Sequence, residues 1–233
     1  MAEFLSLLTL IVCFVTILAA VKFFGKTGLF AYSAISVVIS NVQVLRLTKY
    51  SATDNPVALG TVIFSTLFAV DNILTEYYGS ETARRCVWMN FMYYLFFTLV
   101  MKITNSHPTV DNYDCVNLHR ELKIIFSPCF VIFVSSLISY VVSQLIDIFA
   151  FSTLKKLMKS KYVSLRSFLS MAFSSFIDNF VFSALAWMIF AKNPVSIEVL
   201  WKTYISAAFV IRLIVVVLCV PLVKLCGVAV LKK

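Results

Sequence analysis

The sequence predicts an all-α integral membrane protein with about seven transmembrane helices, and three observations support this prediction. Of its 233 residues, 61% are hydrophobic and only 13% are charged, against roughly half and a quarter in a soluble domain. The apolar residues form long unbroken runs, whereas the strands of an outer-membrane barrel alternate apolar and polar residues. The polar stretches between the runs are too short to hold a soluble catalytic or ATPase domain.

A helical span needs about 20 consecutive apolar residues, and seven stretches approach this length. In chain order they are 4–24, 28–47, 57–79, 86–101, 124–151, 164–191 and 199–231. We expect residues 1–233 to form a single transmembrane domain. The first stretch is expected to be a retained helix, because a signal peptide begins with basic residues and here Lys22 is the first one.

The charge distribution predicts the orientation in the membrane. The net charge is +9, from 20 Lys and Arg against 11 Asp and Glu, and basic residues collect on cytoplasmic loops. Placing the N-terminus outside and the C-terminus in the cytoplasm puts most basic residues inside, including the basic loop from Lys155 to Arg166. Membrane topology therefore accounts for the charge, and no direct contact with nucleic acid is expected.

Ionisable residues within the spans are the first candidates for function. Each costs about 2.5–3.5 kcal/mol at the bilayer centre on insertion scales, so such residues are functional candidates by default. Four lie deep in the predicted spans: Asp71, Asp147, Asp178 and Arg212. A fifth, Glu76, lies nearer a helix end, close in sequence to Arg84 and Arg85.

Helical spacing groups these residues with other polar and aromatic side chains. Residues three or four apart share a helix face, which gives two stripes: Tyr140, Gln144 and Asp147, and Ser170, Ser174, Asp178 and Phe182. Stripes of this kind that face inward would line a polar cavity with aromatic walls. Structural alternatives remain open, because Asp178 and Arg212 could form an ion pair, Glu76 could anchor a helix end, and Asn41 and Gln144 could join helices by hydrogen bonds.

A short internal repeat accompanies these stripes. Residues 70–73, Val-Asp-Asn-Ile, resemble residues 177–180, Ile-Asp-Asn-Phe. If the core consists of the last six spans, the two segments are the middle helices of two halves with three helices each. Halves with an odd number of helices are inverted relative to each other, as in many secondary transporters.

The chemistry of the stripes suits a flat polar base. A guanine-like base presents an N–H and an amino group side by side, and a carboxylate can accept from both. A Gln amide both donates and accepts, and aromatic rings stack on bases. Amines, thiamine-like cations and protons would fit these residues as well.

Five local motifs resemble the queuosine precursor transporter family, a group of vitamin uptake transporters. The most specific is the stretch 71–79, Asp-Asn-Ile-Leu-Thr-Glu-Tyr-Tyr-Gly, followed by Ala-Arg-Arg at 83–85. The others are Ile39-Ser40-Asn41, Gln144 with Asp147, Asp178 with Phe182, and Arg212 with Pro221.

The resemblance implies a carrier in the bacterial inner membrane, with 28–231 as its six-helix core and 4–24 as an additional N-terminal helix. We expect it to work by alternating access and not to be an enzyme. Its substrate would be a 7-deazaguanine base used for tRNA modification: queuine, 7-aminomethyl-7-deazaguanine or 7-cyano-7-deazaguanine. The implied contacts are the base and membrane lipid, with no cofactor or metal and with homodimer formation left open. The expected substrate-binding residues are Asp178, Asp147, Gln144, Arg212, Asp71, Asn41, Ser174, Phe182 and Tyr140. Glu76, Arg84 and Arg85 are expected to form a gate or helix anchor.

Three alternatives differ in class from this carrier. The chain could be the substrate-binding membrane subunit of an energy-coupled vitamin importer, which would co-purify with an ATPase. An intramembrane enzyme is disfavoured, because neither His107 nor His119 lies in a predicted span. A channel would show flux that does not saturate.

The chain departs from the family pattern beside the expected pocket. Where the family often has Gly-Glu or Gly-Asn, this chain has Ser174 and Ser175, and where the family commonly has a Gly, it has Ser143. The pair Ala207-Ala208 stands where the family has Ser-Gln. Arg212 stands where the family has Lys. We hypothesise that these changes favour the bulkier cyclopentenediol arm of queuine, while the choice between proton coupling and facilitated entry stays open.

Overall fold

Seven long helices make up nearly all of the protein that the computed structural model describes, namely residues 1–108, 117, 120–121, 130–191 and 193–231. They are α1 (Ala2–Phe24), α2 (Lys26–Gln43), α3 (Gly60–Tyr77), α4 (Ser80–Thr104), α6 (Phe130–Leu157), α7 (Val163–Ala184) and α9 (Ser206–Leu231). This arrangement confirms the predicted all-α class. The short elements are a hairpin of β1 (Leu47–Thr48) and β2 (Val57–Ala58), the π-helical turns η1 (Leu185–Ile189) and η2 (Leu200–Ile205), and α8 (Ile197–Val199).

Several boundaries differ from those expected from apolar run length. The predicted span 28–47 ends early, because after Gln43 the chain turns into the antiparallel β1–β2 hairpin that precedes α3. The predicted span 86–101 is longer at both ends, since α4 begins directly after Gly79, whose φ of 89° breaks the helix. Arg84 and Arg85 therefore lie inside the first turns of α4. The predicted start of the fifth span, at 124, lies outside the described residues.

Five segments of the described chain are long and apolar enough to cross a membrane. They are Ala2–Phe24, Ser80–Thr104, Val131–Leu157, Val163–Ile189 and Ile197–Val230. The two remaining long helices, α2 and α3, have 18 residues each and are richer in polar residues. Nearly every side chain of α3 is buried, since α2, α4, α6 and α9 pack around it. Helix α3 is therefore surrounded by protein rather than lipid. Polar residues in membrane helices usually face such a protein interior.

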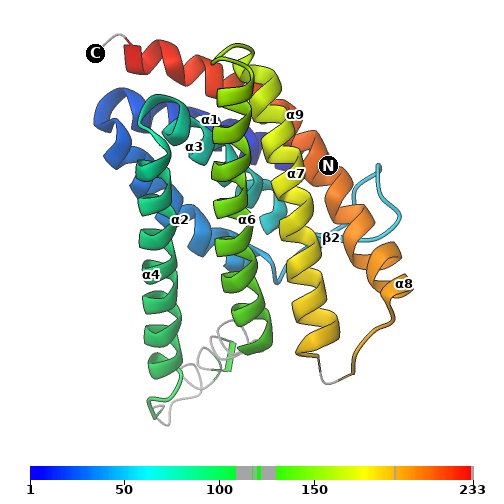
Figure 1. Ribbon diagram of the computed structural model, residues 1–233. Helices are drawn as coiled ribbons and strands as arrows, with labels where there is room; N and C mark the ends of the chain where they lie inside the picture. Colours follow the sequence, from blue (N-terminus) through cyan, green and yellow to red (C-terminus); the bar gives the residue numbers. More distant parts are fainter. Residues whose placement is uncertain (109–116, 118–119, 122–129, 192, 232–233) are drawn as a thin grey trace.

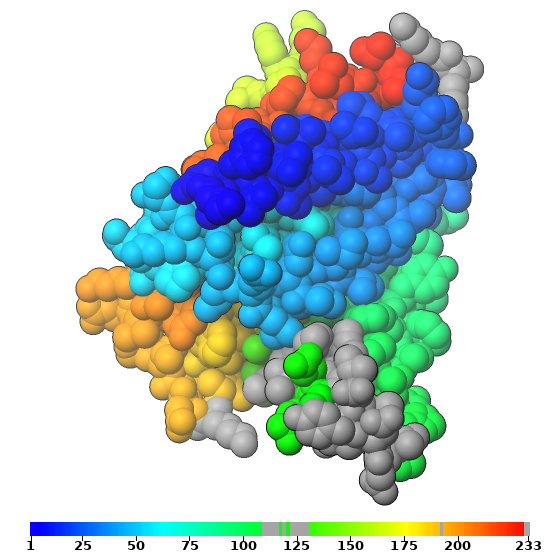
Figure 2. Space-filling view, turned by 180° about the vertical axis from the view of Figure 1, so that it is seen from behind, coloured from blue at the N-terminus to red at the C-terminus, as the bar shows by residue number. Residues whose placement is uncertain are grey.

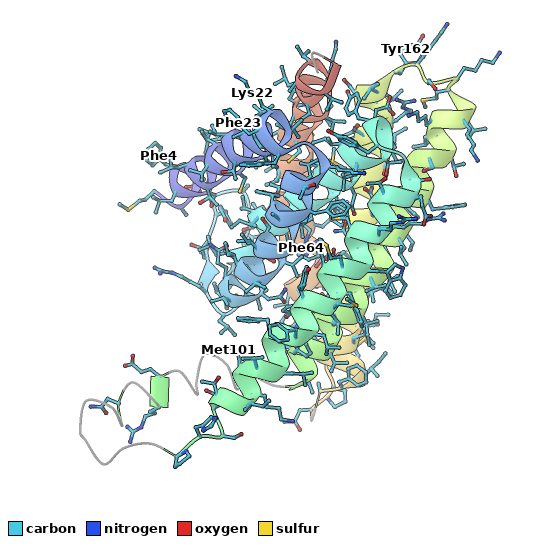
Figure 3. All side chains as sticks on the ribbon, turned by 90° about the vertical axis from the view of Figure 1, so that its left-hand side faces the viewer. Phe4, Lys22, Phe23, Phe64, Met101 and Tyr162 are labelled. Atoms are coloured by element: carbon cyan, nitrogen blue, oxygen red, sulfur yellow. The ribbon has the colours of Figure 1, made fainter. Side chains whose placement is uncertain are left out.

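The helices form a bundle with α3 at its centre. In Figure 1, α4, α6 and α7 run side by side, α9 crosses behind α7, and the C-terminus lies at the same end as the α6–α7 turn. Helix α1 lies across the back of the bundle (Figure 2), and its residues Phe4 and Phe23 lie on the side of the bundle away from α4 (Figure 3). Its buried stripe of Leu10, Cys13, Ile17 and Val21 packs on α2, α3 and α9, and much of its remaining surface is exposed and apolar.

A close approach of α2 and α3 shapes the interior near the hairpin. A Cβ added to Gly60 would lie 2.1 Å from the carbonyl oxygen of Ser40, so only glycine fits at this crossing. Further along the same two helices, the hydroxyl groups of Tyr32 and Thr66 form a hydrogen bond of 2.7 Å. These contacts hold α2 against the start of α3 and fix one wall of the cavity described next.

Candidate functional site

A cavity of about 510 Å³ lies on the hairpin side of the bundle. Residues of α2, the hairpin, α3, α6, α7, η1, η2 and α9 line it. Its volume is within the range of about 300–1,000 Å³ that is typical of small-molecule sites. Four of the predicted site residues are among its lining: Asn41, Asp178, Phe182 and Arg212.

The charged part of the cavity wall is an ion pair between α7 and α9. Oδ2 of Asp178 lies 2.6 Å from Nη1 of Arg212, and Oδ1 of Asp178 accepts a hydrogen bond of 3.0 Å from the Ser143 hydroxyl. The guanidinium of Arg212 also lies over the ring of Phe64, at 5.3 Å from its centroid. Both charged side chains are buried, and each compensates the charge of the other. The pair is therefore structural and at the same time part of the cavity wall.

Aromatic rings form much of the remaining wall. Phe64, Phe182, Trp187 and Tyr204 all line the cavity, and the rings of Trp187 and Tyr204 stack with centroids 4.9 Å apart and an interplanar angle of 25°. Sequence reasoning found Phe182 but missed the other three. The spacing of Phe64, seven residues before Asp71, gave no signal for the cavity, because Asp71 itself does not line it.

Trp187 and Tyr204 lay beyond that kind of reasoning. They belong to η1 and η2, where the backbone hydrogen bonds follow the π-helical pattern. A π-helical turn shifts the register of side chains relative to the α-helix. Stripes that are extrapolated from the α-helical period therefore point to the wrong residues at this end of α7 and α9.

Five predicted site residues do not line the cavity. Asp71, Tyr140, Gln144, Asp147 and Ser174 are all buried deeper in the bundle. Asp71 of α3 lies close enough to Asp147 of α6 for their charges to interact, and the Ser170 hydroxyl of α7 donates to the carboxylate of Asp147. We call Asp71, Gln144, Asp147 and Ser170 the buried carboxylate cluster.

The side chain of Glu76 joins three helices at the end opposite the hairpin. Its Oε2 lies 3.0 Å from Nζ of Lys155 and 3.0 Å from Nη2 of Arg166, and Lys155 also donates to the carbonyl oxygen of Glu76 at 2.9 Å. Arg166 is completely buried and lies over the ring of Phe151. We call Glu76, Lys155 and Arg166 the ion-paired end cluster.

The sequence led us to expect Arg84 and Arg85 beside Glu76, and the structure places both elsewhere. Both arginines are exposed on α4, and Arg85 pairs with the exposed Glu81 at 3.4 Å. Because α4 already begins at Ser80, its first turns carry these side chains outward. Arg166, expected in a basic loop, instead lies in the first turn of α7 and faces the interior.

Comparisons of the sequence with known proteins found a matching family and two similar proteins. The sequence model of a family described as "Putative vitamin uptake transporter" matches residues 58–226. A "Probable queuosine precursor transporter" of Bacillus subtilis (strain 168) is 29% identical over 197 residues, which cover 84% of this chain and 83% of that protein. A protein of the same description from Haemophilus influenzae Rd is 29% identical over 128 residues, or 55% of this chain and 51% of that one. No solved structure matches the chain.

Proposed function

Because the chain belongs to this family of vitamin uptake transporters, we propose that it is a secondary transporter that imports a queuosine precursor across the bacterial inner membrane. The family is one of transporters rather than enzymes. The substrate class comes from the two relatives, whose descriptions name queuosine precursors. Within that class of 7-deazaguanine bases, we propose queuine as the preferred substrate.

The observation that carries this proposal is the Asp178–Arg212 pair in an aromatic-walled cavity. A 7-deazaguanine presents a ring N–H and an amino group next to each other, with a carbonyl oxygen on the other side of that N–H. The carboxylate of Asp178 would accept from both donors, and the guanidinium of Arg212 would donate to the carbonyl oxygen. The flat ring would stack on the aromatic wall, of which Phe64 and Trp187 are parts.

The same pair supports a binding step by exchange of partners. Before binding, Arg212 and Ser143 occupy the two oxygens of Asp178. A base that reaches the cavity would replace Arg212 on Asp178 and offer Arg212 its own oxygen instead. Each charged group then has a hydrogen-bond partner on the base, which limits the cost of separating the buried pair.

Release on the other side requires the opposite end of the bundle to open. The cavity lies on the hairpin side, whereas the ion-paired end cluster joins α3, α6 and α7 at the far end. We propose that the cavity faces the outside, with the C-terminus and the basic α6–α7 turn in the cytoplasm. The ion-paired end cluster would then act as the inner gate, and α1 would be an addition to a six-helix core.

Uptake of labelled queuine tests the proposal, in cells that lack queuosine synthesis and their own transporter. We expect saturable uptake that unlabelled 7-cyano- and 7-aminomethyl-7-deazaguanine inhibit, and its loss in Asp178→Asn. Asp54→Asn, the same chemical change at an exposed position of the hairpin loop, is the matched control. Absence of uptake of all three bases by protein present in the membrane would overturn the proposal, and an ATPase that co-purifies would favour a binding subunit of an energy-coupled importer.

A further inference from the structure

We propose that the buried carboxylate cluster is a proton site separate from the cavity, and that Asp71 and Asp147 hold the proton that drives import of the base. This inference rests on the transport function proposed above and names its energy source. Secondary transporters often place coupling ions near the bilayer midplane, beside but not within the substrate site. Buried Asp and Glu residues are the usual carriers of protons in such proteins.

The position of the two carboxylates is the first argument. Asp71 is 4% exposed and Asp147 is fully buried, and their charges interact across the contact of α3 with α6. Neither lines the cavity. The buried ion pairs of the described residues involve Asp178 and Glu76 and leave these two carboxylates without a cation.

Among the described residues, no basic side chain forms an ion pair with Asp71. Helix α4 contributes Cys86, and α6 contributes Tyr140 as well as Asp147. The other packed helices bring groups that already have partners: Tyr32 of α2 bonds Thr66, and Asp178 of α7 pairs with Arg212 of α9. Helix α1 carries the buried thiol of Cys13. Two carboxylates in one buried site without a cation cannot both be ionised at low cost, so the arrangement in which one of them is protonated is the stable one.

Unpartnered polar groups beside the carboxylates are the second and independent argument. Gln144 is fully buried, and among the described residues neither its amide oxygen nor its amide nitrogen has a hydrogen-bond partner. It lies on α6 between Tyr140 and Asp147, the two residues of that helix that interact with Asp71. Asn72 is likewise buried without a partner in the described chain. Buried polar groups normally have partners, so these amides are available to hydrogen-bond a group that carries or relays a proton.

The ligand chemistry favours a proton over a metal ion. Within the described residues, no group of three or more His, Cys, Asp or Glu side chains could hold a metal. The cluster offers two carboxylates, an amide and the Ser170 hydroxyl, which donates to Asp147. These groups are sufficient to hold a proton, whereas a divalent cation calls for more oxygen ligands.

The contact of α6 with α7 connects this site to the cavity. Ser143 of α6 bonds Asp178 of α7 in the cavity wall, and Ser170 of α7 bonds Asp147 of α6 in the cluster. A bound base would displace the partners of Asp178, and a bound proton would change the charge beside Ser170. Both events therefore act on the same pair of helices, α6 and α7. Two ligands that bias one shared element are coupled in their binding.

Purified protein in liposomes provides the test, with labelled queuine as the probe. An imposed difference of about one pH unit, acidic on the side of entry, is expected to give about tenfold accumulation for one proton per base. A protonophore abolishes this accumulation, and a sodium gradient does not replace the pH difference. Asp71→Asn and Asp147→Asn, which mimic the protonated state, are expected to lose accumulation but to keep exchange of labelled for unlabelled base, while Asp54→Asn behaves as the wild type.

The exchange measurement separates the two proposals and also reports that each variant is folded. Wild-type protein that exchanges queuine but does not respond to the pH difference overturns only the proton site. Full accumulation by both Asp71→Asn and Asp147→Asn overturns it as well, as does accumulation that requires sodium. Wild-type protein that neither exchanges nor accumulates any of the three bases overturns the transport function together with the proton site.

Discussion

Replacing Asp178 with Asn removes the only acidic side chain in the described lining of the cavity. The amide keeps one acceptor oxygen but places an N–H₂ group where a substrate N–H would bind. A hydrogen bond to a charged group contributes about 1.5–3 kcal/mol and a neutral one about 1 kcal/mol. Exchanging two charged contacts for one neutral contact therefore costs about 2–5 kcal/mol, so we expect the affinity for queuine to fall about 30-fold or more.

The same substitution also perturbs the fold, and a second variant separates the two effects. Arg212 would lose its partner at 2.6 Å, and breaking a buried ion pair on one side costs about 3–5 kcal/mol of stability. The double variant Asp178→Asn/Arg212→Met removes both charges and is expected to recover most of that stability. If the pair recognises the base, the double variant still fails to bind.

Equilibrium binding of labelled queuine to purified protein in nanodiscs measures the affinity, and thermal unfolding of the same samples measures the stability. Asp54→Asn is the control, because it makes the same Asp-to-Asn change at a residue outside the cavity lining. A double variant that binds queuine as tightly as the wild type would refute the assignment, because the pair would then be structural only.

Three further predictions concern other parts of the molecule. Glu76→Gln is expected to lower the free energy of unfolding by about 3 kcal/mol, because it leaves Lys155 and Arg166 without a counter-charge. The control Glu81→Gln, in an exposed pair, is expected to change it by less than about 1 kcal/mol. Equal shifts of the unfolding temperature in the two variants would contradict this. Ala208→Gln places a larger side chain in the cavity next to Arg212. It is therefore expected to reduce uptake of queuine more than uptake of 7-cyano-7-deazaguanine, whose substituent is smaller. Equal reductions would argue against binding of the queuine arm at that position. Gly60→Ala is expected to lower the yield of monodisperse protein in size-exclusion chromatography, because its Cβ would lie 2.1 Å from the Ser40 carbonyl oxygen; a wild-type yield would show that α2 and α3 can separate.

Run length and helical period were sufficient to predict the helices and the burial of their polar residues. Asp71, Asp147, Asp178 and Arg212 were selected because charges within apolar runs are costly, and all four are buried. The ion pair of Asp178 with Arg212 was one of the alternatives that the sequence left open, and the structure contains it. The position of a helix and the depth of a residue within it depend on that one helix, so both can be read from the sequence.

The division of the polar residues between two sites could not be predicted in the same way. The helical period says which residues share a face but not which faces meet, so Asp147 and Asp178 were assigned to one cavity although only Asp178 lines it. Arg166 shows a second limit. Counting charges near helix ends treated it as a loop residue, whereas its side chain extends from the first turn of α7 to Glu76. Direction, unlike depth, depends on tertiary packing.

The polar character of α3 places a constraint on how the bundle can move. Asp71 and Thr75 are each only 4% exposed, because other helices surround α3, and turning them toward lipid would incur the insertion cost of polar groups. Helix α3 is also held to α9 where the Tyr77 hydroxyl donates to the carbonyl oxygen of Val223, in space that Gly227 leaves free.

The contacts of α3 with α6 and α7 at that same end are of a different kind. They are the ion pairs of Glu76 with Lys155 and Arg166, whose charges can exchange partners with water when the end opens. A close-packed contact gives way only with loss of its packing, whereas an ion pair at a wetted end is weak once solvated. This difference favours α3 and α9 as the fixed part of the protein and α6 and α7 as the pair that moves, which is the pair that carries both Asp147 and Asp178.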